Sequence, residues 1–150
     1  MTPLAEVECL VSPERRLILV CGDAPQDTGF VPDFGTGRLC YSDRDVLYLV
    51  SVSDYHDASV TLQTWDAEPP PDPAAEHSEA VEVELSRGGA FVSALLGPRV
   101  SPVLRVGPPG RYHVRVDVTG REAVRLRLVD LDDRPSGVER FVVAFWPTGG

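Results

Sequence analysis

The stretch GRYHVRVDV, residues 110–118, alternates polar and apolar side chains. The two sets are Arg111, His113, Arg115 and Asp117 on one parity and Tyr112, Val114, Val116 and Val118 on the other. A period of two is typical of a β-strand with one face in the core and one face in water. Because Tyr112 opens this strand after a turn, we expect its hydroxyl to bridge the end of a β-sandwich.

Strand-like runs extend from this segment in both directions along the chain. They are residues 17–21, 46–52, 60–64, 81–85 and 141–146. The first two runs and the last are apolar on both faces, which favours central strands. Turn residues such as Ser12-Pro13-Glu14 and Arg87-Gly88-Gly89 separate neighbouring runs at hairpin spacing. The sequence therefore predicts an all-β fold, an antiparallel β-sandwich of about nine or ten strands.

Two long irregular stretches interrupt these runs. Residues 22–37 are rich in Gly and Asp, and residues 67–78 carry four prolines, so both are predicted to be surface loops. A single helical turn is predicted from Asp72-Pro73 through Glu79, because proline is favoured at the first helical position. Residues 121–133 fit both a strand and a helix, and we favour a strand at residues 124–128.

The chain has the composition of an ordinary globular protein. It contains 150 residues, of which 43% are hydrophobic, so wholesale disorder is excluded and a single domain spanning residues 1–150 is expected. The first residues do not have the basic segment and apolar run of a secretory signal. No window approaches the run of about 18 apolar residues that predicts a membrane span, and we expect a cytoplasmic protein.

The net charge of −9 is divided unevenly. Residues 1–86 contain 17 acids and 4 arginines, a net charge of −13, and residues 87–150 contain 10 arginines and 6 acids, a net charge of +4. Direct binding to nucleic acid or to an anionic membrane is disfavoured, because affinity for phosphate depends on concentrated cations. The acidic half either forms a solvated surface or offers a docking face to a basic partner.

Within the acidic half, Trp65 falls on the polar parity of its strand. It is either an anchor at an interface or a side chain that packs beneath the proline-rich loop. The candidate interaction surface consists of Asp54, Asp57, Trp65, Asp66 and Glu68.

A second candidate site is basic. If residues 111–118 and a strand at 124–128 are neighbours, an anion-binding patch would consist of Arg111, His113, Arg115, Arg125 and Arg127. The alternative is that Glu82 and Glu84 lie beside this patch and neutralise it, as interspersed charges usually do at a protein surface.

Metal and cofactor patterns are incomplete. The chain has three cysteines, Cys9, Cys21 and Cys40, without a CxxC pair. We interpret them as buried free thiols. Asp130, Asp132 and Asp133 resemble part of a calcium loop but do not have the glycine and glutamate that complete an EF-hand. We therefore predict neither a metal nor a cofactor.

The strongest catalytic candidate is His56, which Asp54, Tyr55 and Asp57 surround and which follows Ser51 and Ser53 closely. Adjacent residues in a turn point in different directions, so this proximity does not supply the geometry of a catalytic triad. A polar turn is the favoured interpretation and no catalytic residue is predicted, with a hydrolase built around His56 as an alternative.

Four motifs follow one another in the second part of the chain. They are WDAEPP at residues 65–70, EAVEVEL at 79–85, PPGRYHVRV at 108–116 and FVVAFWP at 141–147. Over residues 45–147 this order resembles the small bacterial proteins grouped around competence protein J, the DNA-entry nuclease inhibitor. The resemblance implies a soluble β-sandwich that binds and blocks a partner, in the founding case a nuclease, and it implies no catalytic residues.

These observations together predict a non-enzymatic soluble binding protein. We expect an inhibitor or immunity-type partner of a basic nuclease or toxin, acting through the acidic surface. The alternative is a small-ligand or carbohydrate-binding β-sandwich module that uses Trp65 and neighbouring loops.

Overall fold

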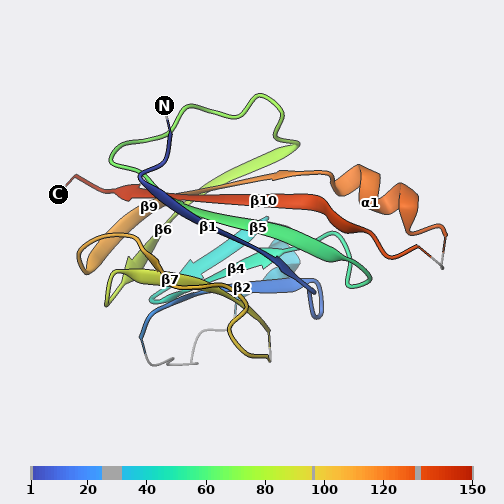
Figure 1. Ribbon diagram of the computed structural model, residues 1–150, viewed down its shortest axis with the longest axis horizontal. Helices are drawn as coiled ribbons and strands as arrows, with labels where there is room; N and C mark the ends of the chain where they lie inside the picture. The colour runs from blue at the N-terminus through green and yellow to red at the C-terminus, as the bar shows by residue number, and fades with distance from the viewer. Residues whose placement is uncertain (1, 25–31, 96, 131–132, 150) are drawn as a thin grey trace.

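Two five-stranded sheets form the protein (Figure 1). The computed structural model describes residues 2–24, 32–95, 97–130 and 133–149. The first sheet has the order β1 (Ala5–Val11), β5 (Asp57–Thr64), β10 (Ser136–Pro147), β9 (Gly110–Thr119) and β6 (His77–Leu85). The second has the order β3 (Cys40–Asp43), β4 (Val46–Val50), β2 (Leu17–Gly22), β7 (Gly89–Ala94) and β8 (Leu104–Arg105). Neighbouring strands are antiparallel, except that β5 and β10 are parallel.

The core lies between the two sheets. Side chains such as Leu62 and Phe141 of the first sheet and Leu49 and Val92 of the second belong to one buried cluster. The alternation predicted for residues 111–118 is confirmed, because all four of its apolar side chains are buried. The Tyr112 hydroxyl donates a hydrogen bond to the Pro108 carbonyl oxygen at 2.5 Å, which confirms the predicted bridge. The all-β sandwich is therefore confirmed.

The prediction of a strand at residues 124–128 is wrong. The chain leaves β9 at Gly120, whose φ of 82° is in the left-handed region, and forms the helix α1 (Arg121–Arg127). In a strand, Val124 and Leu126 would face the same side. In the structure Val124 is fully buried against the sandwich, whereas Leu126 is 68% exposed. The helical interpretation of this ambiguous pattern was the correct one.

The helical turn predicted from Asp72 through Glu79 is also wrong. Residues 77–79 begin β6, which pairs with β9 from His77 to Leu85. Asp72 forms only a local turn, in which its side chain accepts a hydrogen bond from the Ala74 amide and its carbonyl oxygen accepts one from the Ala75 amide. Strand pairing therefore overrides the local helix signal of Asp72-Pro73.

The remaining loop and cysteine predictions have clear outcomes. Residues 66–76 form a long surface loop. Of the loop predicted at residues 22–37, positions 25–31 lie outside the described residues, and Phe34–Thr36 form a short 3-10 helix, η1. All three cysteines are free; Cys21 and Cys40 are buried and Cys9 is half-buried. No helix in the described ranges is long and apolar enough to cross a membrane.

Candidate functional site

The predicted interaction surface is divided between the two ends of β5. Asp54 and Asp57 lie at the beginning of this strand, and Trp65, Asp66 and Glu68 follow its end. A strand of eight residues at roughly 3.3 Å per residue separates the two groups by about 25 Å. The structure therefore does not bring the five residues together in one patch.

Asp54 and Asp57 form internal contacts. Asp57 Oδ1 accepts hydrogen bonds from Ser12 Oγ at 2.6 Å and from Arg134 Nη2 at 3.0 Å. The Ser12 bond, together with Arg134, lowers the pKa of the Asp57 carboxyl. Asp54 Oδ1 accepts a hydrogen bond from the Arg16 amide. Both carboxylates thus stabilise the loops at this end of the sandwich.

Trp65 is 8% exposed. Its Nε1 donates a hydrogen bond to Gln63 Oε1 at 3.0 Å, and its backbone amide donates one to the Phe145 carbonyl oxygen. The indole therefore offers little surface on which a partner or a sugar ring could stack.

Asp66 and Glu68 belong to the loop at residues 66–76, which crosses the outer face of the first sheet (Figure 1). Arg115 on β9 fixes this loop by donating hydrogen bonds to the carbonyl oxygens of Pro69 and Pro70 at 3.0 and 2.9 Å. At its far end the Glu76 carboxylate accepts hydrogen bonds from the amides of Gly120 and Arg121. The loop contains four acids and no basic residue.

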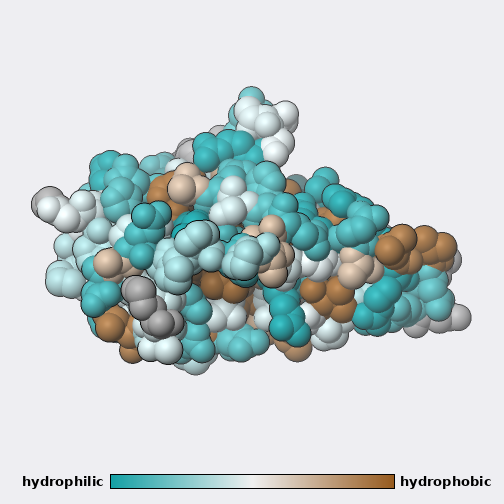
Figure 2. Space-filling view, turned by 90° about the horizontal axis from the view of Figure 1, so that it is seen from above, coloured by the Kyte–Doolittle hydropathy of each residue, from teal (hydrophilic) through white to brown (hydrophobic). Residues whose placement is uncertain are grey.

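The acids of this loop share their face with two glutamates of the edge strand β1. Strand pairing places Glu6, Gln63, Ala144 and Arg115 in one row across the sheet, so Glu6 and the Arg115 anchor point to the same side. Figure 2, which looks onto this side, shows a mainly hydrophilic surface. We define the acidic face as Glu6, Glu8, Asp66, Glu68 and Asp72.

The predicted anion patch is not assembled either. Arg111, His113 and Arg115 lie on β9, whereas Arg125 and Arg127 lie on α1, since residues 124–128 are not a strand. The strand beside β9 is β6, which places Glu82 opposite His113 and Glu84 opposite Arg111. His113 Nδ1 lies 3.9 Å from Glu82 Oε1. The alternative given for the basic patch, in which Glu82 and Glu84 lie beside its cations, is therefore the arrangement in the structure.

A different group of arginines converges at the end of the sandwich where α1 begins. A pocket of about 630 Å³ is lined there by five of them, Arg15, Arg16, Arg38, Arg121 and Arg125. They come from the turn between β1 and β2, from the segment before β3 and from α1. Only Arg125 belongs to the predicted anion patch, because long-range packing, which strand periodicity does not encode, brings these five arginines together. The sequence feature that could have indicated this pocket is the adjacent pair Arg15 and Arg16 in a tight turn.

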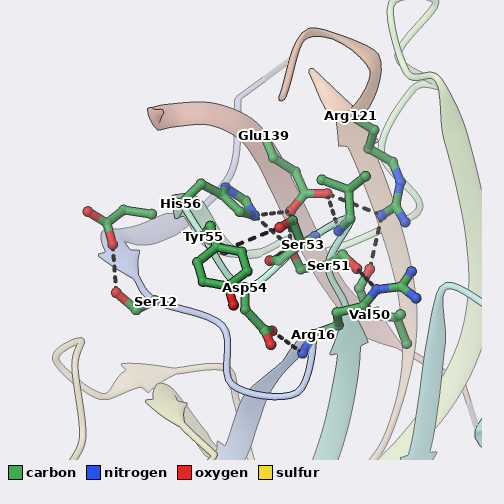
Figure 3. A network of polar contacts seen from close by, with 12 residues as sticks. Ser12, Arg16, Val50, Ser51, Ser53, Asp54, Tyr55, His56, Arg121 and Glu139 are labelled. Carbon is green, nitrogen blue, oxygen red and sulfur yellow. Dashed lines mark hydrogen bonds and ion pairs between the residues drawn. The ribbon is translucent and has the colours of Figure 1, made fainter. Parts of the chain in front are cut away.

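Below this pocket lies a fully buried polar network (Figure 3). The Ser51 hydroxyl lies 2.8 Å from His56 Nε2 and 2.5 Å from Glu139 Oε1. Glu139 Oε2 accepts a hydrogen bond from the Val52 amide at 3.0 Å and forms an ion pair with Arg121 Nη1 at 3.3 Å. Burial raises the pKa of the Glu139 carboxyl, while the contacts with Ser51 and Arg121 oppose this rise.

This network has the residue types of a catalytic triad but not its accessibility. Ser51, His56 and Glu139 are fully buried, and none of them lines the arginine-lined pocket. Because the Ser51 hydroxyl is buried among the described residues, this geometry does not favour a hydrolase built around His56. The sequence analysis did not identify Glu139 as a site residue. A signal was present, because Glu139 shares the inward parity of Phe141 and Phe145. A charged residue on an inward parity predicts a buried partner.

Metal ligation has little support in the described part of the chain. No group of three or more His, Cys, Asp or Glu side chains there is placed to hold a metal ion. Asp132 of the calcium-like triplet lies outside the described residues. Asp133 instead accepts two hydrogen bonds from the Arg127 guanidinium at 2.8 and 2.9 Å.

Comparison with known proteins gives matches of structure only. Neither the protein-family models nor the curated protein sequences contain a match to this chain. The crystal structure of ComJ from Bacillus subtilis, an inhibitor of the DNA-degrading activity of NucA, is similar with a TM-score of 0.64 and 12% identity over 99% of this chain and 96% of ComJ. The structure described as crocagin biosynthetic gene J is similar with a TM-score of 0.58 and 20% identity over 97% of this chain and 99% of that one. The resemblance found in the motif order is thus confirmed for the fold.

Proposed function

We propose that the protein is a single-domain, non-enzymatic, cytoplasmic binding protein of the inhibitor or immunity type. Its partner is a basic protein of the nuclease or toxin class, and the acidic face is the docking surface. The likeness of the whole fold to a nuclease inhibitor supports this class of function. The distribution of charge supports the choice of surface.

The observation that carries the proposal is the loop at residues 66–76. Asp66, Glu68 and Asp72 are exposed, and none of them forms an ion pair with any residue in the described ranges. Arg115 and Glu76 hold the loop against the sheet at two points, so the three carboxylates are presented on a fixed backbone. A preorganised surface loses less conformational entropy on binding than a mobile one.

The mechanism is electrostatic attraction followed by steric blockade. The carboxylates of the acidic face attract the cationic cleft with which a nuclease binds phosphates, and such charge complementarity accelerates association. The β-sandwich behind the loop then occupies the space that the nucleic acid needs. No group on the acidic face has to react in this mechanism.

The first experiment is capture of the partner from the native host, followed by a test of whether the purified protein inhibits the captured activity. We expect a basic nuclease or toxin that is inhibited with a saturable stoichiometry. The double variant Asp66→Asn, Glu68→Gln should inhibit at least about tenfold less well, since loss of close charge pairs weakens association. The matched control Glu14→Gln, Asp43→Asn changes the net charge equally outside the acidic face. Equal losses in both variants would remove the acidic face from the proposal.

A further inference from the structure

The arginine-lined pocket is a concentration of positive charge in an acidic protein. Five arginines and His77 line it, and the described lining contains no carboxylate. Three of the arginines have carboxylate partners behind the lining: Arg38 with Glu79 at 3.3 Å, Arg121 with Glu139 at 3.3 Å and Arg125 with Glu122 at 3.3 Å. These three pairs are balanced in charge.

Arg15 and Arg16 are not balanced in this way. Arg16 Nε donates a hydrogen bond to the Ser51 carbonyl oxygen at 3.0 Å, which orients the guanidinium without neutralising it. The Arg15 side chain has no hydrogen bond or ion pair with any residue that the structure describes. The two guanidinium groups thus have no carboxylate partner among the described residues, although the Asp54 carboxylate lies nearby, on the Arg16 backbone amide.

Both of these arginines have an unfavourable backbone conformation. Their φ angles are 53° and 65°, in the left-handed region, where they form the two-residue turn between Glu14 and Leu17. Asn and Gly are the usual residues of such a turn, because they tolerate positive φ. Strained positions of this kind cluster at functional sites, and Arg15 and Arg16 are two of the three non-glycine residues with positive φ in the described ranges, Asp45 being the third.

A third guanidinium is held close to Arg16. Arg121 Nη1 donates a hydrogen bond to the Val50 carbonyl oxygen at 2.9 Å, and Arg16 bonds the carbonyl of the next residue, Ser51. Figure 3 shows the two side chains side by side, on the same side of the buried network. Burial lowers the pKa of Arg121, and the charges of Arg125 and Arg16 lower it further. Glu139 fixes Arg121 among these like charges through its buried ion pair.

The rest of the wall is apolar. Leu17, Val50 and Leu39 contribute to it together with Phe34. The Phe34 ring is held edge-to-face against Tyr41 and Tyr48, with centroid distances of 5.1 and 5.8 Å. One side of the pocket can thus bind an anionic group while the other covers a flat or apolar one.

We propose that this pocket binds a small organic phosphate monoester, with the phosphate between Arg15 and Arg16 and the organic part against Phe34 and Leu39. A phosphate monoester carries a charge of about −1.5 to −2 at neutral pH, which matches the two unpaired arginines better than a single carboxylate does. Guanidinium groups bind phosphate oxygens through paired hydrogen bonds. The volume of about 630 Å³ is that of a small-molecule site.

The test is calorimetric titration of the full chain with three probes: phenyl phosphate, inorganic phosphate and benzoate. We expect phenyl phosphate to bind more tightly than both other probes, since only it has a dianion and a ring. Benzoate binding as tightly as phenyl phosphate would overturn the assignment of a phosphate. Inorganic phosphate binding as tightly as phenyl phosphate would overturn the role of the apolar wall.

The decisive variant is Arg15→Gln, because this side chain has no contact that the fold requires. Its matched control is Arg87→Gln, an exposed arginine outside the pocket that changes the net charge equally. Loss of a charge-assisted contact should weaken phenyl phosphate binding about tenfold or more in Arg15→Gln and leave it unchanged in the control. Unchanged binding in Arg15→Gln, or equal loss in both variants, would overturn the proposal. Inhibition of the partner through the acidic face should be the same in Arg15→Gln and wild type, so the two proposals are tested separately.

Discussion

Glu79→Gln perturbs the contact that holds one wall of the arginine-lined pocket. Glu79 lies on β6, and its side chain is 16% exposed. Its carboxylate accepts hydrogen bonds from the Leu39 amide and from Arg38 Nε, the latter at 3.3 Å, and lies 3.0 Å from His77 Nε2. Arg38, Leu39 and His77 all line the pocket, so this single carboxylate connects the segment before β3 to the first sheet.

Glutamine keeps the shape of this side chain but retains one acceptor oxygen for several donors. At least one of them then loses its partner, and the Leu39 amide, which belongs to a buried residue, is the most costly to leave unpaired. Loss of a hydrogen bond to a charged group costs about 1.5–3 kcal/mol. With a urea dependence of about 2 kcal/mol per molar for a small protein, the unfolding midpoint should fall by about 1 M.

The same contact gives a pH dependence of known sign. Burial would raise the pKa of Glu79, but the hydrogen bonds from Leu39, His77 and Arg38 outweigh it and hold the pKa below its ordinary value. The stability that the carboxylate contributes is therefore fully present above the unfolded-state pKa of about 4.3 and is lost as the pH falls through the lower, folded-state value. The difference between wild type and Glu79→Gln should be largest at pH 7 and should shrink below about pH 5.

The assay is urea unfolding of both proteins followed by circular dichroism at several pH values from 7 to 3.5. Glu84→Gln is the control, because this neighbour on β6 forms only an exposed ion pair with Arg44 and should change stability by less than about 1 kcal/mol. A Glu79→Gln midpoint equal to that of wild type at pH 7 would refute the reasoning. So would a difference that grows as the pH falls.

Three further predictions concern the fold. Tyr112→Phe removes the hydroxyl that bonds Pro108 and should lower the free energy of unfolding by about 1–2 kcal/mol in urea denaturation, whereas unchanged stability would contradict the predicted bridge. Gly120→Ala places a Cβ 1.8 Å from the Val138 carbonyl oxygen at a φ of 82° and should cost more than about 2 kcal/mol in thermal unfolding. Gly149→Ala is its control, because φ is also positive there but a Cβ would meet nothing within 4 Å, and equal losses would refute the steric argument. Burial raises the pKa of Cys21 to about 11 and that of Cys40 to about 12, so both thiols should resist a thiol reagent at pH 8 in the native protein and react after denaturation; rapid native labelling of either would contradict their burial.

The sequence was sufficient for the all-β class because that class depends on local alternation. It was wrong about two connections, since the turns at residues 12–14 and 87–89 join strands of different sheets and not the two strands of a hairpin. The apolar residues of β9 from Tyr112 to Val118 are buried as their spacing predicts, and so are Val83 and Leu85 of β6. Tyr112 forms the bond expected at the end of a sandwich. Polarity fails as a guide at Asp117, which is buried, and at Glu79, which shares the parity of Val83 and Leu85.

The sequence was insufficient at residues 121–127, where the spacing of Val124 and Leu128 fits a helix and that of Val124 and Leu126 fits a strand. The left-handed turn at Gly120 begins the helix, and the Val138 carbonyl oxygen lies so close that a side chain there would clash with it.

The sites were harder to predict than the fold, because they combine residues that are far apart in the chain. Residues near each other in the sequence, such as Asp57 and Trp65, are separated by the full length of β5. Residues far apart, such as Arg16 and Arg121, meet in one pocket. Charge counting identified an acidic half and a basic half of the chain. The pairing of β6 with β9 places acidic side chains of the first half beside cationic side chains of the second. Asp66, Glu68 and Asp72, like Arg15 and Arg16, are among the charged residues that form no ion pair in the described part of the chain.

The central claim is that the acidic face docks on a basic partner, and its most direct test is the association rate measured across ionic strength. Exposed charges are screened over about 10 Å at 0.1 M salt and over about 3 Å at 1 M, so a contact made by Asp66, Glu68 and Asp72 should associate more slowly as salt rises. We predict that the association rate of the wild type with its captured partner falls steeply between these salt concentrations. The rate of Asp66→Asn, Glu68→Gln should start lower and fall less. An association rate that is independent of salt, or a double variant with the salt dependence of wild type, would contradict the claim.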